Sequence, residues 1–218
     1  MNTRKTVLLG LIIILAAFAV GIYFYPQMPD KIASHWNAQG QVNGYMGKFW
    51  GLFFLPLLTL ALMVIFIALP NLDPLKNNIA DFRKYYNLFV LILVGFLIYL
   101  YVLTIIWNLK HAFRLTQYLA PAFGALFYAT GVMLHHARPN WFVGIRTPWT
   151  LNNERVWQKT HQLGGVLFKL CGVVALMGIL FGKYALWLIL SPILVTSLYL
   201  TVYSYWEFRK GNGNGNGK

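Results

Sequence analysis

The chain has 218 residues, of which 58% are hydrophobic and only 11% are charged, whereas soluble domains contain about 25% charged residues. With a mean hydropathy of +0.57, this composition predicts a membrane protein and argues against an ordinary soluble domain. The net charge of +13 arises from 18 Lys and Arg against five Asp and Glu. These cations fall in connectors between long apolar runs, which favours contact with anionic membrane lipids over direct binding of nucleic acid.

Six apolar runs reach or approach the roughly 20 residues that a membrane-spanning helix needs. They cover residues 6–25, 49–69, 85–107, 117–137, 164–181 and 185–206. The fifth run is short and contains Lys169. The sequence therefore predicts an all-α fold: a polytopic membrane protein with six transmembrane helices.

The basic residues of the connectors predict the orientation of these helices. Twelve Lys and Arg fall on the side that holds both termini, and five fall on the other side. Because cytoplasmic loops carry the excess of positive charge, both termini should be cytoplasmic, in a multi-pass protein of the bacterial plasma membrane. The Gly-Asn tail, residues 211–218, has no apolar content and should be disordered.

Two long connectors divide the predicted chain into units. Residues 1–84 form a two-helix unit with an extracellular connector at 26–48, and residues 85–210 form a four-helix unit with a cytoplasmic connector at 138–163. Long connectors in a compact protein are where binding residues concentrate. The candidate sites are therefore sought in these two segments.

The inner connector carries a specific run of residues. It reads Asn140, then Phe142-x-Gly144-Ile145-Arg146-Thr147-Pro148-Trp149-Thr150-Leu151, then Trp157 and Thr160-His161. This run resembles the signature of the SdpI family, bacterial multi-helix membrane proteins whose namesake gives immunity to a secreted toxin peptide. The outer connector, with Pro29, His35-Trp36-Asn37, Gly40 and Lys48, resembles a domain of unknown function that is often found N-terminal to that signature.

The resemblance implies a non-enzymatic immunity or signalling protein. It would bind a secreted antimicrobial peptide or toxin outside the cell, and a regulatory protein is its expected cytoplasmic partner. The alternative is a transporter or flippase that removes a toxic peptide or a lipid-linked species. Proton-coupled transport would have to depend on His residues or Lys169, because the predicted spans contain no Asp or Glu.

The candidate cytoplasmic site consists of the motif residues and one nearby acid: Asn140, Gly144, Arg146, Thr147, Pro148, Thr150, Glu154, Trp157 and His161. Arg146 follows Gly144 and precedes Pro148, so a tight loop could present its guanidinium as a bidentate clamp for a phosphate or a carboxylate. An intramolecular ion pair between Arg146 and Glu154 is an equally open interpretation.

The segment after the motif has the pattern of a short amphipathic helix. Thr150 or Asn152 would cap it, and the residues of its apolar face would be Val156, Trp157, Thr160 and Leu163. Such a helix would lie in the inner headgroup layer until Gly164-Gly165 turns the chain into the fifth span. It would serve either as a functional surface or only as a structural re-entry element.

The candidate extracellular site comprises His35, Trp36, Asn37 and Gly40. A ring nitrogen, a flat apolar face and an amide in succession could hold a peptide or a lipid headgroup. The alternative is that Trp36 anchors the chain at the membrane interface while His35 makes a local hydrogen bond.

Metal binding and catalysis find little support in the sequence. His135, His136 and His161 with Glu154 are a conceivable cluster, but adjacent helical residues point about 100° apart, which makes the first two a poor chelate. No HExxH, GxSxG, CxxC or phosphate-binding glycine loop occurs, and Cys171 is the single cysteine. The sequence therefore predicts no enzyme, no cofactor and no metal site.

Overall fold

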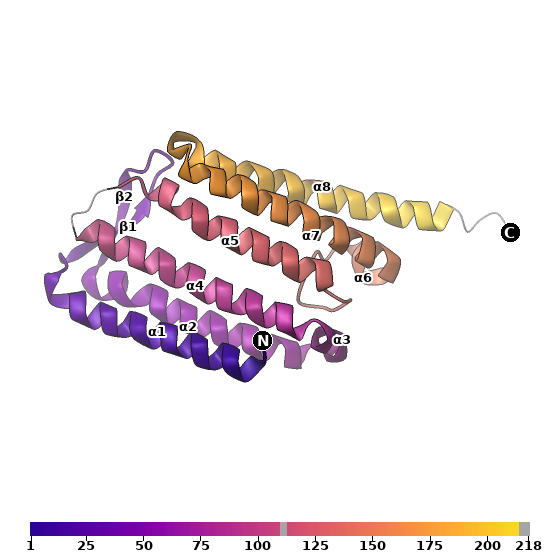
Figure 1. Ribbon diagram of the computed structural model, residues 1–218, viewed down its shortest axis with the longest axis horizontal. Coiled ribbons are helices and arrows are strands. Elements are labelled where there is room, and N and C mark those ends of the chain that lie inside the picture. Colours follow the sequence, from indigo (N-terminus) through magenta and orange to yellow (C-terminus); the bar gives the residue numbers. More distant parts are fainter. Residues whose placement is uncertain (110–112, 214–218) are drawn as a thin grey trace.

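The computed structural model describes residues 1–109 and 113–213, in which long helices lie side by side (Figure 1). The long helices are α1 (Thr3–Phe24), α2 (Lys48–Leu72), α4 (Arg83–Asn108), α5 (Leu115–His136), α7 (Glu154–Leu176) and α8 (Ala185–Gly213). Short elements connect them: the helices α3 (Lys76–Asp81) and α6 (Pro148–Asn152), the 3-10 turns Tyr25–Gln27, Met177–Ile179 and Gly182–Tyr184, and the strands β1 (Lys31–Trp36) and β2 (Val42–Gly47).

Five helices of the described residues are long and apolar enough to cross a membrane, which confirms a mainly helical protein with several membrane-length helices. These candidate spans are Thr3–Gln27, Lys48–Leu72, Arg83–Asn108, Glu154–Ile179 and Gly182–Gly211. The 22-residue α5 is not among them. Gln117 near its start and His135 and His136 at its end lower its apolar content. A sixth span therefore stays a prediction.

The outer connector corrects the all-α prediction, because it folds into a β-hairpin. Strands β1 and β2 pair antiparallel with Lys31 opposite Gly47 and Trp36 opposite Val42. At the turn, Asn37 accepts hydrogen bonds from the backbone N–H groups of Gln39 and Gln41, and Gly40 has a φ of 79° that favours glycine. Asn37 and Gly40, which the sequence analysis placed in a candidate binding site, thus close the turn of a hairpin.

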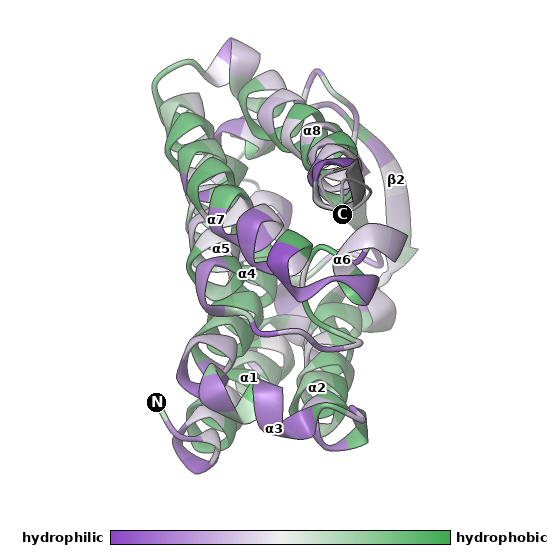
Figure 2. Cartoon of the chain, turned by 90° about the vertical axis from the view of Figure 1, so that its right-hand side faces the viewer, coloured by the Kyte–Doolittle hydropathy of each residue, from purple (hydrophilic) through white to green (hydrophobic). Residues whose placement is uncertain are grey.

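The two long connectors lie at opposite ends of the bundle (Figure 1). At one end, which we call the hairpin end, Asn108 of α4 accepts from the Ala33 N–H at 2.8 Å and donates to the Ala33 carbonyl at 3.1 Å. At the other end, which we call the motif end, α3, α6 and the first turns of α1 and α7 present a hydrophilic surface (Figure 2). The two ends of the helical bundle therefore carry different surfaces: the hairpin at one end and the hydrophilic motif end at the other.

Helices α5 and α7 approach each other closely through glycines. A Cβ on Gly131 would lie 2.7 Å from the carbonyl oxygen of Gly165, and a Cβ on Gly172 would lie 2.7 Å from that of Gly124. Small residues at such a seam allow two membrane helices to pack backbone against backbone. This seam fixes the position of the first turns of α7, where the motif ends.

Helix α8 continues through Gly213, so the first three residues of the predicted disordered tail are helical. The rest of that tail, residues 214–218, lies outside the described residues.

Candidate functional site

The connector between α5 and α7 is folded against the motif end of the bundle. Thr147 caps α6 by accepting from the backbone N–H of Thr150, and the Thr150 hydroxyl accepts in turn from the Thr147 N–H at 2.9 Å. Pro148 follows at the first helical position, where its missing N–H costs nothing. The Thr-Pro-x-Thr part of the motif is thus the start signal of a short helix.

Asn140 organises the turn that precedes α6. Its side chain is almost fully buried at 1% exposure. The amide donates to the carbonyls of Arg138 and Val143, at 2.8 and 2.9 Å, and its oxygen accepts from the N–H groups of Phe142 and Val143. Asn140 therefore substitutes for backbone pairing within the turn and is a positioning residue.

Two residues of the connector between α2 and α4 hold this turn from outside. Asp73, 2% exposed, accepts from the backbone N–H of Trp141 at 2.9 Å, and Asn78 donates to the carbonyl of Pro139 at 2.7 Å. Sequence reasoning missed both residues because they lie more than 60 positions from their partners. The connector between α2 and α4 and the connector between α5 and α7 therefore form one surface at the motif end.

His161 fixes the middle of the motif. Its Nδ1 lies 2.9 Å from the carbonyl oxygen of Trp157, and its Nε2 accepts from the backbone N–H of Ile145 at 3.0 Å. A carbonyl can only accept and a backbone N–H can only donate, so the ring carries its single proton on Nδ1 and is neutral. Trp157 stacks on this ring and donates to the carbonyl of Ala137. Both nitrogens of His161 are therefore occupied by protein.

The predicted interfacial helix is wrong. Helix α7 runs unbroken from Glu154 to Leu176, with Asn153 as its N-cap instead of Thr150 or Asn152. Gly164 and Gly165 do not turn the chain; they let Ile145 and His135 approach the helix. Of the apolar face, Val156, Trp157 and Thr160 are at most 1% exposed and Leu163 is half-buried. This face packs on protein and not on lipid.

The ion pair between Arg146 and Glu154, one of the two interpretations left open by the sequence, does not form. Arg146 is exposed and donates from Nη1 to the carbonyl of Trp141 at 2.6 Å. Glu154 instead accepts from the amide of Gln158 at 3.2 Å. Among the described residues, Arg146 makes no salt bridge with an acid. The Arg146 guanidinium thus uses one N–H group to close the loop onto Trp141, and its other N–H groups can donate to a ligand.

The acid that binds cations at this end is Glu207 of α8. Its side chain is 5% exposed and lies 2.8 Å from Lys159 Nζ, 3.4 Å from Lys210 Nζ and 3.8 Å from Arg155 Nη2. Sequence analysis missed it because the sixth apolar run was ended at Trp206, one residue earlier. Glu207 lies near the end of the candidate span Gly182–Gly211, just beyond the predicted run, and Glu154 begins the candidate span Glu154–Ile179.

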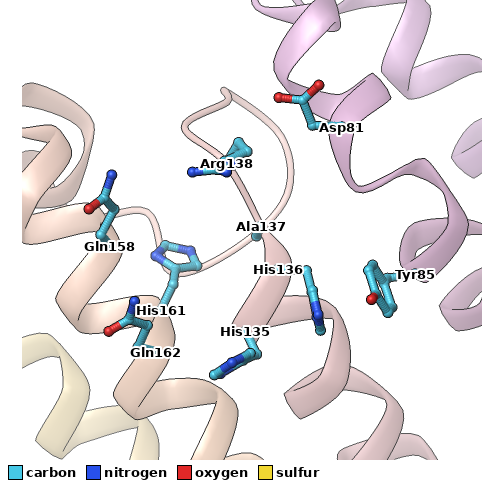
Figure 3. A pocket seen from close by; sticks show the side chains of 9 residues that line it. All are labelled: Asp81, Tyr85, His135, His136, Ala137, Arg138, Gln158, His161 and Gln162. Carbon is cyan, nitrogen blue, oxygen red and sulfur yellow. The ribbon is translucent and has the colours of Figure 1, made fainter.

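A cavity of about 580 Å³ opens at the motif end between α3–α4, the end of α5 and the start of α7 (Figure 3). The three motif-end histidines, His135, His136 and His161, line it together. Within residues 1–109 and 113–213, however, no three His, Cys, Asp or Glu side chains are grouped as metal ligands. Bringing the histidines together therefore creates a polar cavity and not a chelate.

The predicted extracellular residues separate into structural and exposed groups. Asn37 and Gly40 build the hairpin turn. Trp36 is half-buried with its ring 5.5 Å from that of Trp107. His35 is exposed, and its Nδ1 lies 2.5 Å from Oδ1 of Asn43, which matches the local hydrogen bond considered as the alternative. Of the four residues, only His35 is exposed, and the other three are half-buried.

Comparisons with known proteins agree with this geometry. The SdpI/YfhL protein family matches residues 136–204, and a domain of unknown function, DUF1648, matches residues 12–60. The several membrane-length helices and these matches support a multi-pass helical membrane protein, and residues 136–204 are similar to the SdpI/YfhL family. The chain is 23% identical over 211 residues to the immunity protein SdpI of Bacillus subtilis (strain 168), which covers 96% of this chain and 99% of that protein. The resemblance predicted from the motif is confirmed. No solved structure matches the chain.

Proposed function

We propose that this protein is a membrane immunity protein that protects its bacterial host from a secreted antimicrobial peptide or toxin by binding, without catalysis. The observation that carries the proposal is the similarity to the immunity protein SdpI along nearly the whole chain, from the hairpin to α8. The SdpI/YfhL segment, residues 136–204, includes the hydrogen-bonded connector built around Asn140 and His161. A binding protein needs such a fixed surface more than it needs reactive groups.

We further propose that α5 is a sixth span and that the motif end and both termini are cytoplasmic. At 1.5 Å per residue, 22 residues extend about 33 Å, enough for a hydrocarbon core of about 30 Å. Helix α5 packs against α4, α7 and α8, all of membrane length. Arg83, Arg138 and Arg155 are examples of the cations that gather at the motif end, where the positive-inside rule expects them.

The toxin would bind at the hairpin end, where His35, Asn43 and the 62% exposed Tyr45 lie on the hairpin. A cytoplasmic regulatory protein would bind at the motif end. There, Trp141 and Phe142 are 54% and 39% exposed beside Arg146. Adjacent exposed aromatic rings next to a guanidinium are the residue types that dominate protein interfaces.

A transporter or flippase is the second candidate, and one observation favours it. Glu207 places a buried carboxylate in a candidate span that the sequence reading had left without acids. The three cations that contact Glu207 lie near one end of α8. This position supports equally well a purely structural role, in which Glu207 holds α8 to α7. Purified protein in liposomes separates the two: directional, gradient-dependent movement of a labelled peptide supports transport, and saturable binding without movement supports immunity by binding.

The immunity proposal is tested in a strain that lacks this protein, challenged with a panel of secreted antimicrobial peptides. We expect at least one peptide to kill the deletion strain more readily than its parent, and expression of the chain to restore survival. A deletion strain as resistant as its parent to every peptide contradicts immunity.

The topology is tested by labelling single cysteines in intact cells. Cys171 is 3% exposed and gives a low background. Ala38→Cys at the hairpin turn should react with an impermeant reagent, whereas Asn77→Cys in α3 should react only after permeabilisation. Labelling of both positions in intact cells contradicts the six-span arrangement.

A further inference from the structure

A row of cavities follows the contact between α4 and α5, from the polar motif end into the apolar middle of the bundle. The first is the polar cavity of about 580 Å³ in Figure 3. The second, of about 360 Å³, lies between α4, α5 and α7, and the third, of about 410 Å³, lies between α4 and α5. The second and third share Ile92, Pro121 and Ala125, so they form one apolar groove.

The polar cavity and the apolar groove are adjacent along both helices. On α4, Tyr85 lines the polar cavity and Leu88, three residues later, lines the groove. On α5, His136 lines the polar cavity and Val132, four residues earlier, lines the groove. Residues three and four apart lie on the same face of a helix. On α4 and on α5, the polar cavity and the apolar groove are therefore lined by one continuous helix face. Tyr85 and His136 stack with their ring centres 3.6 Å apart and mark the level of the change.

The groove has the length of one lipid leaflet. From Leu88 to Tyr99, its two limits on α4, eleven residues rise about 16 Å at 1.5 Å each. Half of a hydrocarbon core of about 30 Å is about 15 Å, the depth that one acyl chain occupies. The rim of the groove is open, because Leu88, Tyr128 and Val173 are 41%, 50% and 52% exposed.

The polar end offers hydrogen-bond donors and positive charge. Arg138 and Gln162 are exposed at the cavity, and neither side chain has a hydrogen-bond partner among the described residues. Lys84 stands 4.7 Å from the ring centre of Tyr85, beside the same cavity. The one acid in the lining is the exposed Asp81. In the lining, Arg138 is matched by the carboxylate of Asp81, and the neighbouring Lys84 adds a further positive charge. This balance favours an anion, and guanidinium and amide groups are suited to phosphate oxygens.

We propose that this row of cavities binds one anionic phospholipid of the leaflet at the motif end, with an acyl chain in the groove and the phosphate beside Arg138. The site touches α3, α4, α5 and α7, so the bound lipid would join α3 and α4 to α5 and α7 at the level where the motif connector begins. It is separate from the hairpin and from the exposed Trp141–Arg146 surface.

The test uses the full chain, purified and delipidated in detergent, with thermal unfolding followed at increasing lipid concentration. Phosphatidylglycerol should raise the unfolding midpoint saturably. Neither diacylglycerol, which lacks the phosphate, nor glycerol phosphate, which lacks the acyl chains, should do so. A response to glycerol phosphate as strong as that to phosphatidylglycerol would mean a free-anion site and would overturn the proposal.

Two variants with matched controls locate the site. Arg138→Gln should weaken phosphatidylglycerol binding about tenfold, since charge-assisted contacts dominate phosphate recognition, and Ala125→Phe should abolish it by filling the groove. The controls are Arg4→Gln, at the same end but outside the cavity, and Ala61→Phe, equally exposed on α2. Both should bind as the unchanged chain does. Equal affinity in Ala125→Phe and Ala61→Phe would overturn the proposal, and native mass spectrometry of retained lipid checks each variant independently of its stability.

Discussion

The Nε2 atom of His161 lies so close to Gly144 that a Cβ on residue 144 would collide with it. Gly144 also has a φ of 123°, a backbone conformation that side chains disfavour. These two facts have one cause: the loop approaches α7 so closely that the backbone N–H of Ile145 reaches the imidazole. The glycine and the histidine of the motif are therefore one structural unit, 17 residues apart in sequence.

Gly144→Ala should destabilise the protein by about 2 kcal/mol or more, because it adds a collision with a fixed ring to an unfavourable φ. The control is Gly40→Ala, where φ is 79° but nothing lies within 4 Å of the new Cβ. That variant carries only the conformational cost of about 1 kcal/mol. Thermal unfolding in detergent measures both, and equal losses would show that His161 does not hold the loop.

Glu207→Gln should loosen the end of α8 from α7. Removing one partner of a fully buried ion pair lowers the stability of a protein by about 3–5 kcal/mol. Here the three cations are 43–67% exposed and can regain water, so the expected loss is about 1–2 kcal/mol. Glu154→Gln is the control, because Glu154 is exposed and bonds only the amide of Gln158. Its stability should change by less than about 0.5 kcal/mol. Equal effects of the two variants on stability would contradict the role of Glu207 in holding α8 to α7.

The helices could be predicted from the sequence because hydrophobic length is a local signal. The boundaries depend on contacts that are not local, and α7 illustrates this. Its first ten residues look amphipathic, and the glycine pair after them suggests a break. In the structure the same glycines face α5 and Ile145, so the helix continues and its apolar face is covered by protein.

The hairpin of the outer connector also depends on a contact between residues that are distant in the sequence. The hairpin is held against α4 by Asn108, which is 75 positions from Ala33. At the motif end, the residues of the signature were found by resemblance, yet most of them hold the loop in place. Asp73 and Glu207, which fasten the connector and α7, carry no local pattern that would reveal them.

Asn108→Ala should detach the hairpin from α4. Ala33 is 1% exposed, and the variant leaves both its N–H and its carbonyl without their side-chain partner, at a cost of about 2 kcal/mol. Because these two hydrogen bonds, together with the core packing of Ile32, hold the hairpin to the bundle, trypsin should cleave faster at Lys31 and Lys48 in detergent-purified protein. Asn43→Ala, which removes only the exposed contact with His35, should be cleaved at the unchanged rate. Identical cleavage of the two variants would place the anchor elsewhere.

Arg146→Lys separates bidentate recognition from simple positive charge. The guanidinium of Arg146 bonds the carbonyl of Trp141 with one edge and, alone among the predicted motif residues, combines an exposed side chain with a permanent charge. Lysine keeps that charge but loses the planar fork. If the motif end binds a carboxylate or phosphate of a partner through Arg146, the variant should lose most of its protection against the toxin while it accumulates in the membrane at the normal level.

Arg4→Lys, at the same end of the bundle, is the matched control and should protect as the unchanged chain does. Protection by Arg146→Lys equal to that control would show that the residue contributes only to the positive charge of the cytoplasmic side. Loss of accumulation would instead assign Arg146 to the closure of the loop through Trp141. Glu154→Gln should not reproduce that defect, because Glu154 and Arg146 do not touch.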